Sequence, residues 1–389
     1  MLRLRSTFNY ISTITIKVKR LSYRNIHTSS SPIAFAFDID GVLVRSRNPI
    51  PNASKTLNYL TKENVPFILL TNGGGYTETQ RVEQINSILN TKLHPNQIVL
   101  SHTPFKSISS DYEKILAVGP PVSTKQVARE YGFKEVYEVG DIVEYNRNIA
   151  PFSALSNKVF NPTLKRYYTD NNADTLLDLT TKPFDGIFVF SDPRDWGADV
   201  QIVLDLLNSE KGILNTKRNY KSDKPSIPIF FSQKDFLWAN NYTLNRFGLG
   251  AYREIIHRLY TLMNNNAVLK DTVMGKPTSI SYEYAMHVLN RLHRVKHNGK
   301  SHPEDCDNFE INPQTVSNNT MAKNNVFSKV YMVGDNPASD IIGAYNYGWS
   351  SCLVRTGVYK DGDPLPCQPT MIVDDVWQAV QQALRKEGK

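Results

Sequence analysis

Residues 33–43, which read IAFAFDIDGVL, constrain the fold of this chain more than any other stretch. They begin with an apolar run that contains no turn residue, which is typical of a strand buried on both faces, as inside a parallel sheet. Asp38 and Asp40 follow at once, and a turn at Gly41 lets the two side chains diverge. Because ligands of doubly wound sheets bind beyond the carboxyl ends of strands, the two acids could divide the work of nucleophile and proton donor. They could also belong to an ordinary polar loop.

The chain alternates between predicted strands and helices, which indicates an α/β fold with a doubly wound parallel sheet. The first elements are a helix led by Pro51, a strand at 65–70, a helix at 77–90 and a strand at 98–101. The last are helices at 250–263 and 279–294, a strand at 329–333, a helix from Pro337 to Gly348, strands near 353–355 and 371–373, and a helix at 374–386.

Residues 106–244 hold a second set of alternating elements. The expected strands are at 114–119, 136–139, 186–190 and 228–232, with helices near 123–131 and 198–208. This is enough for an inserted α/β domain, which leaves residues 32–105 and 245–389 for the core. Within the second part of the core, residues 295–326 are polar with almost no periodic apolar positions, so we expect a surface excursion without a core of its own.

The N-terminal segment, residues 1–31, differs in composition from the rest. It carries six Lys and Arg residues, many Ser and Thr residues and no acid. This is typical of a mitochondrial transit peptide, so we expect a mature chain that starts near residues 30–34 and acts in the mitochondrion, in the matrix. The alternative is a basic arm that binds nucleic acid. Removal of six positive charges lowers the formal net charge from +8 to +2, so we expect no nucleic-acid binding by the mature domain.

Composition also argues against several other classes of protein. No run approaches the ~18 apolar residues of a membrane span. The three cysteines, Cys306, Cys352 and Cys367, have no short pairing spacing, which argues against a zinc site and a disulfide framework. At 389 residues, 40% of them hydrophobic, the chain is long enough for two globular domains.

Four polar signals follow one another along the chain, each at a strand end or a helix start. They are Asp38 with Asp40, Thr71 with Asn72, Lys276 on a turn, and Asp335 with Asp340. Each has a plain structural alternative: Thr71 could cap a helix, Lys276 could be solvated, and the last pair could favour a helix N-terminus. Together they are a stronger indication, because such positions lie at the same edge of a parallel sheet.

The order and types of these residues resemble the haloacid dehalogenase (HAD) superfamily, over about residues 33–357. The insertion between Thr71 and Lys276 is similar to the α/β cap of subclass IIA, which contains the NagD-type and pyridoxal or glycol phosphate phosphatases. The segments FDIDGVLV, SQKDFLW and RFG look most like its eukaryotic mitochondrial branch, the cat-eye-syndrome critical-region candidate family. The resemblance implies a Rossmann-like core with an inserted cap.

By this resemblance Asp38 would be the nucleophile, which forms an aspartyl-phosphate, and Asp40 the general acid and then the base. Superfamily members that keep this second Asp are mostly phosphatases or phosphomutases. Thr71, with backbone amides around Asn72, would hold the phosphoryl group, and Lys276 would screen the negative charges.

The resemblance also implies a Mg²⁺ site. Asp38, the backbone carbonyl of Asp40, and Asp335 would bind the ion, and Asp340 would support it. Hard oxygen ligands suit Mg²⁺, and a cation would reduce the repulsion between a carboxylate nucleophile and a phosphate dianion.

The cap departs from its relatives at one turn. Where related caps have Asn-Pro-Asp, this chain has Gln233-Lys234-Asp235. We expect substrate choice to depend on residues 232–250, and above all on Asp235 and Trp238, although Trp238 could simply pack. A cap that closes over the site favours a small phosphorylated metabolite as substrate.

The sequence therefore predicts a mitochondrial Mg²⁺-dependent phosphatase that acts on a small phosphomonoester. The alternatives are a HAD-fold binding or assembly protein with weak or no hydrolytic activity, and a phosphotransferase. The residues expected for catalysis, phosphate binding and the metal are all present, which favours an enzyme: Asp38, Asp40, Thr71, Lys276, Asp335 and Asp340. The sequence leaves the oligomeric state open, and a homodimer is compatible with it.

Overall fold

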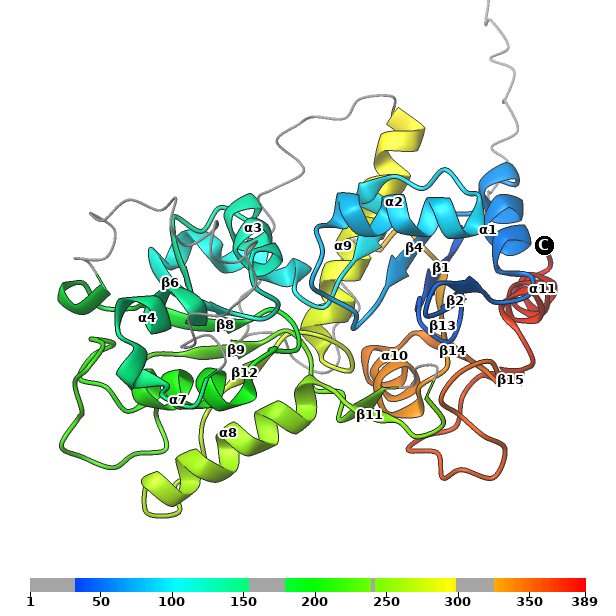
Figure 1. Cartoon of the computed structure of the whole chain (residues 1–389). Helices are drawn as coiled ribbons and strands as arrows, with labels where there is room; N and C mark the ends of the chain where they lie inside the picture. The colour runs from blue at the N-terminus through cyan, green and yellow to red at the C-terminus, as the bar shows by residue number, and fades with distance from the viewer. Residues whose placement is uncertain (1–31, 154–178, 239–241, 299–324) are drawn as a thin grey trace, which may run out of the picture.

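The structure of the chain is a computed structural model that describes residues 32–153, 179–238, 242–298 and 325–389. These residues form two α/β units that lie side by side (Figure 1). The two ends of the described chain build one unit, the core, and the middle builds the other, the cap. The predicted fold class, a doubly wound parallel core with an inserted α/β unit, is confirmed.

The core is built around a six-stranded parallel sheet with the order β15-β14-β13-β1-β4-β5. Strand β1 (Ile33–Phe37) lies in the middle, between β13 (Lys329–Gly334) and β4 (Phe67–Leu70). The outer strands are β5 (Ile98–Val99), β14 (Ser350–Val354) and β15 (Met371–Val373). The central place of β1 explains why all five of its residues are apolar and buried.

Helices cover both faces of this sheet. The phenylalanines of β1 point to one face and its alanines to the other, since successive side chains of a strand alternate. The phenylalanine face is covered by α1 (Ala53–Lys62), α2 (Glu78–Leu89) and α11 (Val376–Lys386). The alanine face is covered by α9 (Ser279–Asn298) and α10 (Ile342–Tyr347).

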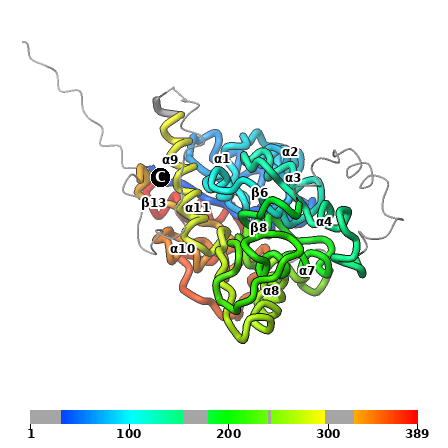
Figure 2. Tube along the Cα trace, turned by 90° about the vertical axis from the view of Figure 1, so that its left-hand side faces the viewer, coloured from blue at the N-terminus to red at the C-terminus, as the bar shows by residue number. Residues whose placement is uncertain are grey.

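The cap has a five-stranded parallel sheet with the order β12-β9-β8-β6-β7. Its strands are β6 (Lys114–Val118), β7 (Glu135–Glu138), β8 (Gly186–Val189), β9 (Ile229–Phe231) and β12 (Thr272–Val273). One face packs against α4 (Val139–Tyr145), α7 (Trp196–Leu207) and α8 (Leu249–Met263), and the other against η2 (Thr103–Asp111) and α3 (Ser123–Glu130). Figure 2, turned by 90° from Figure 1, again shows α7 and α8 on the opposite side of the cap from α3.

The remaining elements are short. They are β2 (Val44–Arg45), β3 (Asn48–Pro49), η1 (Pro95–Gln97), η3 (Arg147–Ile149), β10 (Leu237–Trp238), β11 (Arg246–Phe247) and η6 (Pro337–Ile341).

The cap extends further along the chain than predicted. Helix α8 shares one apolar cluster with α7, and β12 pairs with β9 of the cap sheet. The predicted boundary at residue 244 is therefore corrected to just after Val273. The amphipathic pattern of α8 shows that this helix has an apolar face, but it does not show which sheet that face covers.

Three predicted segments lie wholly or partly outside the described residues. The expected transit peptide, residues 1–31, is one, and residues 154–178 of the cap are another. Of the expected polar excursion at 295–326, residues 299–324 lie outside, while residues 295–298 still belong to helix α9. Among the described residues, no helix has the length and apolarity that crossing a bilayer requires.

Candidate active site

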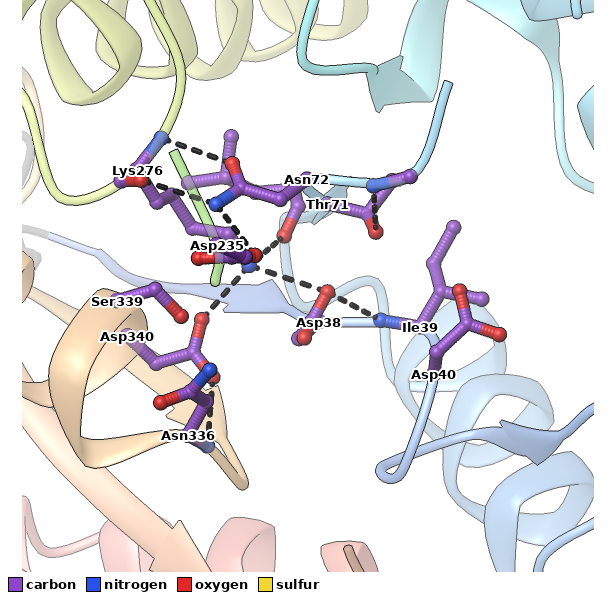
Figure 3. A network of polar contacts seen from close by, with 12 residues as sticks. Asp38, Ile39, Asp40, Thr71, Asn72, Asp235, Lys276, Asn336, Ser339 and Asp340 are labelled. Carbon is purple, nitrogen blue, oxygen red and sulfur yellow. Dashed lines mark hydrogen bonds and ion pairs between the residues drawn. The ribbon is translucent and has the colours of Figure 1, made fainter. Parts of the chain in front are cut away.

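Asp38 lies directly after β1, at the carboxyl edge of the core sheet (Figure 3). Its N–H donates to the carbonyl of Val333 at 2.9 Å, so the pairing with β13 continues one residue beyond the strand. Its Oδ1 accepts from the N–H of Ile39 at 2.8 Å and lies 3.1 Å from Nζ of Lys276. The two donors hold the carboxyl group in one orientation, while its side chain stays 12% exposed and open to a reactant.

Asp335 and Asp340 bring two more carboxylates to the same point. Asp335 follows β13, the neighbour of β1, and Asp340 lies in the short helix η6 that leads into α10. One oxygen from each of Asp38, Asp335 and Asp340 lies within 4.8 Å of the others. The predicted grouping of these three acids is therefore present in the structure.

Gly41 makes room for this cluster. Its φ of +86° is in the left-handed region, and a Cβ there would lie 2.3 Å from Oδ2 of Asp335. Oδ2 of Asp335 also accepts from the N–H of Val358 at 2.7 Å. Both the backbone conformation and the close approach thus call for glycine directly after Asp40.

Lys276 supplies a positive charge in the cluster. Its side chain is 1% exposed, and Nζ lies 2.7 Å from Oδ1 of Asp340, 3.1 Å from Oδ1 of Asp38 and 2.8 Å from the carbonyl of Leu70. Burial alone would lower the pKa of Lys276, but the two carboxylates raise it, so the ammonium stays charged. The alternative of a solvated lysine is excluded.

The cluster carries more negative charge than Lys276 neutralises. Burial raises the pKa of Asp335 well above its ordinary value and raises that of Asp340 as well, and repulsion from Asp38 adds to both shifts. Asp335 and Asp340 are 2% and 0% exposed, so water screens them little. A divalent cation with a preference for oxygen ligands would relieve this repulsion, and the three carboxylates are therefore a fitting site for one.

Thr71 and Asn72 follow β4 on the other side of β1. Oγ1 of Thr71 accepts from the N–H of Gly73 at 3.0 Å, within the glycine-rich turn. The Asn72 side chain instead binds the backbone of Lys276, since its Oδ1 accepts from the N–H and its Nδ2 donates to the carbonyl of that residue, both at 2.9 Å. The side chain of Asn72 is thus occupied in holding the Lys276 turn, so its backbone is the part left for a ligand.

The cap reaches the cluster through Asp235. Its Oδ2 accepts from Nδ2 of Asn72 at 3.0 Å, which connects the turn after β9 to the core. Burial raises the pKa of Asp235 to about 6, although the bond from Asn72 acts in the opposite direction. Trp238 lies three residues further on, in β10, with about half of its surface exposed. The structure therefore brings Asp235 to the site. Among the described residues, no hydrogen bond or ion pair connects Trp238 to the acidic cluster.

The carboxylate of Asp40 turns away from Asp38 (Figure 3). It lies outside the acidic cluster, and its Oδ2 is 3.2 Å from Nη2 of Arg81 in α2. A Cβ on Gly73 would lie 3.5 Å from the same oxygen, so the carboxylate borders the glycine-rich turn. Although half of the side-chain surface is open to solvent, the surrounding protein desolvates the carboxyl and raises its pKa against the opposing charge of Arg81. Sequence reasoning missed Arg81, because an arginine in an amphipathic helix ordinarily faces solvent.

Two family models match the chain, and both describe the same family. One, described as haloacid dehalogenase-like hydrolase, matches residues 35–134, and the other, described as HAD-hydrolase-like, matches residues 273–379. Mitochondrial hydrolase YKR070W of Saccharomyces cerevisiae is 50% identical over 366 residues, which cover 93% of this chain and 98% of that protein. A protein of Schizosaccharomyces pombe, named as a fusion of cardiolipin synthase (CMP-forming) and mitochondrial hydrolase, is 33% identical over 98% of this chain and 59% of its own length.

Solved structures share the fold at lower identity. The p-nitrophenyl phosphatase from Archaeoglobus fulgidus has a TM-score of 0.54 and 14% identity, over 90% of this chain and 98% of that one. NagD from Escherichia coli K-12 has a TM-score of 0.51 and 16% identity, over 89% of this chain and 97% of that one. The resemblance to the superfamily noted in the sequence is confirmed: the chain belongs to the haloacid dehalogenase-like hydrolases, and its core with the inserted cap shares the fold of NagD.

Proposed function

We propose that this hydrolase is a Mg²⁺-dependent phosphatase that hydrolyses a small phosphomonoester in mitochondria. The observation that carries the proposal is the buried cluster of Asp38, Asp335 and Asp340 around Lys276, at the edge of the core sheet that faces the cap. The carboxylate of Asp38 is held in a fixed orientation, and the ammonium of Lys276 lies beside it. Asp40, whose pKa is raised, borders the glycine-rich turn that follows β4. This arrangement suits transfer of a phosphoryl group to Asp38.

In the first step, a carboxylate oxygen of Asp38 attacks phosphorus as the bond from phosphorus to the ester oxygen breaks. Asp40 gives its proton to the departing oxygen, so an alcohol leaves and an aspartyl-phosphate remains. In the second step, Asp40 takes a proton from water, the resulting hydroxide attacks phosphorus, and inorganic phosphate leaves Asp38. The raised pKa of Asp40 suits a group that must first give and then take a proton.

The residues around Asp38 would bind the phosphoryl oxygens. The Thr71 hydroxyl accepts from Gly73 and keeps its own proton to donate, and the backbone of the glycine-rich turn can approach closely because it lacks side chains. Lys276 lies between Asp38 and Asp340 and reduces the repulsion between the carboxylates and an incoming phosphate.

Mg²⁺ would be held by Asp38, Asp335 and the backbone carbonyl of Asp40, with Asp340 as support. Among the described residues, no backbone N–H donates to the Asp40 carbonyl, which is consistent with such a role. When bound, the ion supplies positive charge at the transferring phosphoryl group. The protein itself would hold the three carboxylates in position and keep Lys276 charged.

The proposal is tested by release of inorganic phosphate from a panel of phosphomonoesters, with Mg²⁺ and with a chelator. The panel includes p-nitrophenyl phosphate, because a structural neighbour bears that name, and small sugar and alcohol phosphates. It also includes phosphorylated phospholipid precursors, because one relative is fused to a cardiolipin synthase. We expect Mg²⁺-dependent release from at least one compound. If no compound released phosphate, with or without Mg²⁺, the result would favour the alternative of a binding or assembly protein without hydrolytic activity.

A phosphotransferase would use the same first step with an alcohol in place of water. Turnover in the presence of added alcohols distinguishes a phosphotransferase from a phosphatase, because transfer yields a new phosphoester and hydrolysis yields phosphate. We expect phosphate to be the main product, since Asp40 lies next to solvent on the side of Arg81.

Asp235 and Trp238 should govern the choice of substrate. We expect Asp235→Ala or Trp238→Ala to change the preference among phosphoesters more than it changes turnover of a small aryl phosphate, since core residues contact the phosphate and cap residues the rest of the substrate. The measurement is kcat/KM over the panel, with Lys234→Ala as an exposed neighbouring control. Equal losses on every substrate would show that the two residues are structural.

The N-terminal segment should be removed on import. It lies outside the described residues, but its basic, acid-free composition and the relatives named as mitochondrial hydrolases support import. We expect N-terminal sequencing of the mitochondrial protein to begin between about Asn25 and Ala34. A mature species that still begins at Met1 would contradict this.

A further inference from the structure

A hairpin beside the active site exposes an unusual number of large apolar side chains. The arms of this hairpin, residues 235–238 and 242–248, contain β10 and β11. Five apolar side chains in these arms are between 42% and 64% exposed: Phe236, Leu237, Trp238, Leu244 and Phe247. Exposed apolar residues that are scattered singly need no explanation, but a cluster of this kind marks a surface that another body covers.

The pairing of the two arms leaves apolar groups on both faces of the hairpin. Leu237 pairs with Phe247 and Trp238 with Arg246, and successive side chains of a strand point to opposite faces. Among the described residues, no third strand joins this pair. A two-stranded ribbon in water is only marginally stable by itself, so contact with a further surface would stabilise it.

The base of the hairpin is tied to the active site. The N–H of Gly250, at the start of α8, donates to the carbonyl of Asp235 at 2.9 Å, and the side chain of Asp235 accepts from Asn72. The N–H of Gly248 donates to the carbonyl of Phe236, also at 2.9 Å, and closes the ribbon. A surface that binds the hairpin would therefore lie next to the acidic cluster.

We propose that this hairpin docks on the surface of an anionic phospholipid bilayer. Residues 236–248 contain no acid, and the exposed charged residues at this ribbon are Lys234 and Arg246. Aromatic side chains that can lie at the boundary between headgroups and acyl chains, next to basic residues that attract anionic headgroups, are the combination that interfacial segments use. Docking of this kind involves the described arms of the hairpin and does not require a membrane-spanning helix.

The charge pattern favours a lipid surface over a second copy of the chain. A twofold interface brings the same patch of both copies together, and residues 236–248 of the second copy would offer no acid to pair with Arg246 or Lys234. Anionic headgroups instead provide the opposite charge along the whole patch.

The test is co-sedimentation of the full chain with phosphatidylcholine vesicles that do or do not contain phosphatidylglycerol. The test variant is Leu244→Ser with Phe247→Ser, because these two apolar side chains are the most exposed of the five in the hairpin arms. The control variant is Leu262→Ser with Tyr345→Ser, which removes an exposed leucine and an exposed aromatic residue of similar exposure from α8 and α10. The basic N-terminal segment is present in every sample, so its own attraction to vesicles cancels in the comparison.

We expect the parent chain and the control variant to bind phosphatidylglycerol vesicles more strongly than neutral ones. The partition coefficient of the hairpin variant should fall by at least about 10-fold, because two large apolar side chains no longer enter the bilayer interface. Unchanged unfolding temperature of the hairpin variant shows that its fold is intact. Equal binding of the parent and the hairpin variant would overturn the proposal. The proposal would also be overturned if the parent chain did not bind vesicles but formed a dimer, and the hairpin variant were monomeric. Because the readout is binding, the outcome does not depend on whether the protein is a phosphatase.

Discussion

Replacement of Asp38 by asparagine should abolish turnover of every phosphomonoester that the parent enzyme hydrolyses. A carboxamide has nearly the shape of a carboxylate but is a poor nucleophile, so the covalent step cannot occur. We expect a loss on the order of 10⁴-fold or more, as is found when covalent enzymes lose their nucleophile. Phosphate release at saturating Mg²⁺ measures it.

The fold of the Asp38→Asn variant should survive, because Lys276 keeps its contacts with Asp340 and the carbonyl of Leu70. The matched control is Asp361→Asn, the same chemical change at an exposed residue. A variant at Asp38 that unfolds like the parent and still retains a large part of its activity would show that another group attacks phosphorus.

Replacement of Asp40 by asparagine should slow the cleavage of alkyl phosphates far more than the cleavage of aryl phosphates. An alkoxide needs a proton to leave, whereas an activated phenolate leaves unaided, so cleavage of alkyl phosphates should fall by roughly 10²–10⁴-fold and formation of the phosphoenzyme from aryl phosphates far less. Because Asp40 would also activate water, the second step should become limiting with aryl substrates. Stopped-flow measurement should show a burst of phenolate followed by slow turnover.

The contact between Arg81 and Asp40 supplies a control for this experiment. Arg81→Gln leaves the carboxyl group in place and should retain the ability to cleave alkyl phosphates to a much larger extent than Asp40→Asn. Equal slowing of both ester types by Asp40→Asn, without a burst, would mean that Asp40 acts through the metal or the fold.

The core of this fold could be predicted because its strands are buried on both faces. An unbroken apolar run such as residues 33–37 fits a central strand of a parallel sheet, and the acids that follow it can then lie only at the carboxyl edge. Asp335 directly follows the adjacent strand β13 for the same reason, so its closeness to Asp38 follows from strand order. The joint order of these signals, rather than any one of them, indicated the site.

Side-chain partners across the two units could not be predicted in this way. Asn72 binds the backbone of Lys276 and the carboxylate of Asp235, and these contacts cross from the core to the cap. Nothing in the local sequence of Asn72 distinguishes these contacts from binding of a phosphate through the side-chain amide. The end of the cap was misplaced for a related reason, since the apolar face of α8 fits either sheet.

Trapping of the phosphoenzyme would show whether Asp38 carries the phosphoryl group during catalysis. The Asp40→Asn variant is mixed with an aryl phosphate and Mg²⁺, quenched in acid during the burst, and digested for peptide mass spectrometry. We expect one added phosphoryl group on the peptide that contains Asp38, at an amount that matches the burst, and none in the Asp38→Asn,Asp40→Asn double variant. A burst without a phosphoryl group on that peptide, or a phosphoryl group on another residue, would show that Asp38 is not the nucleophile.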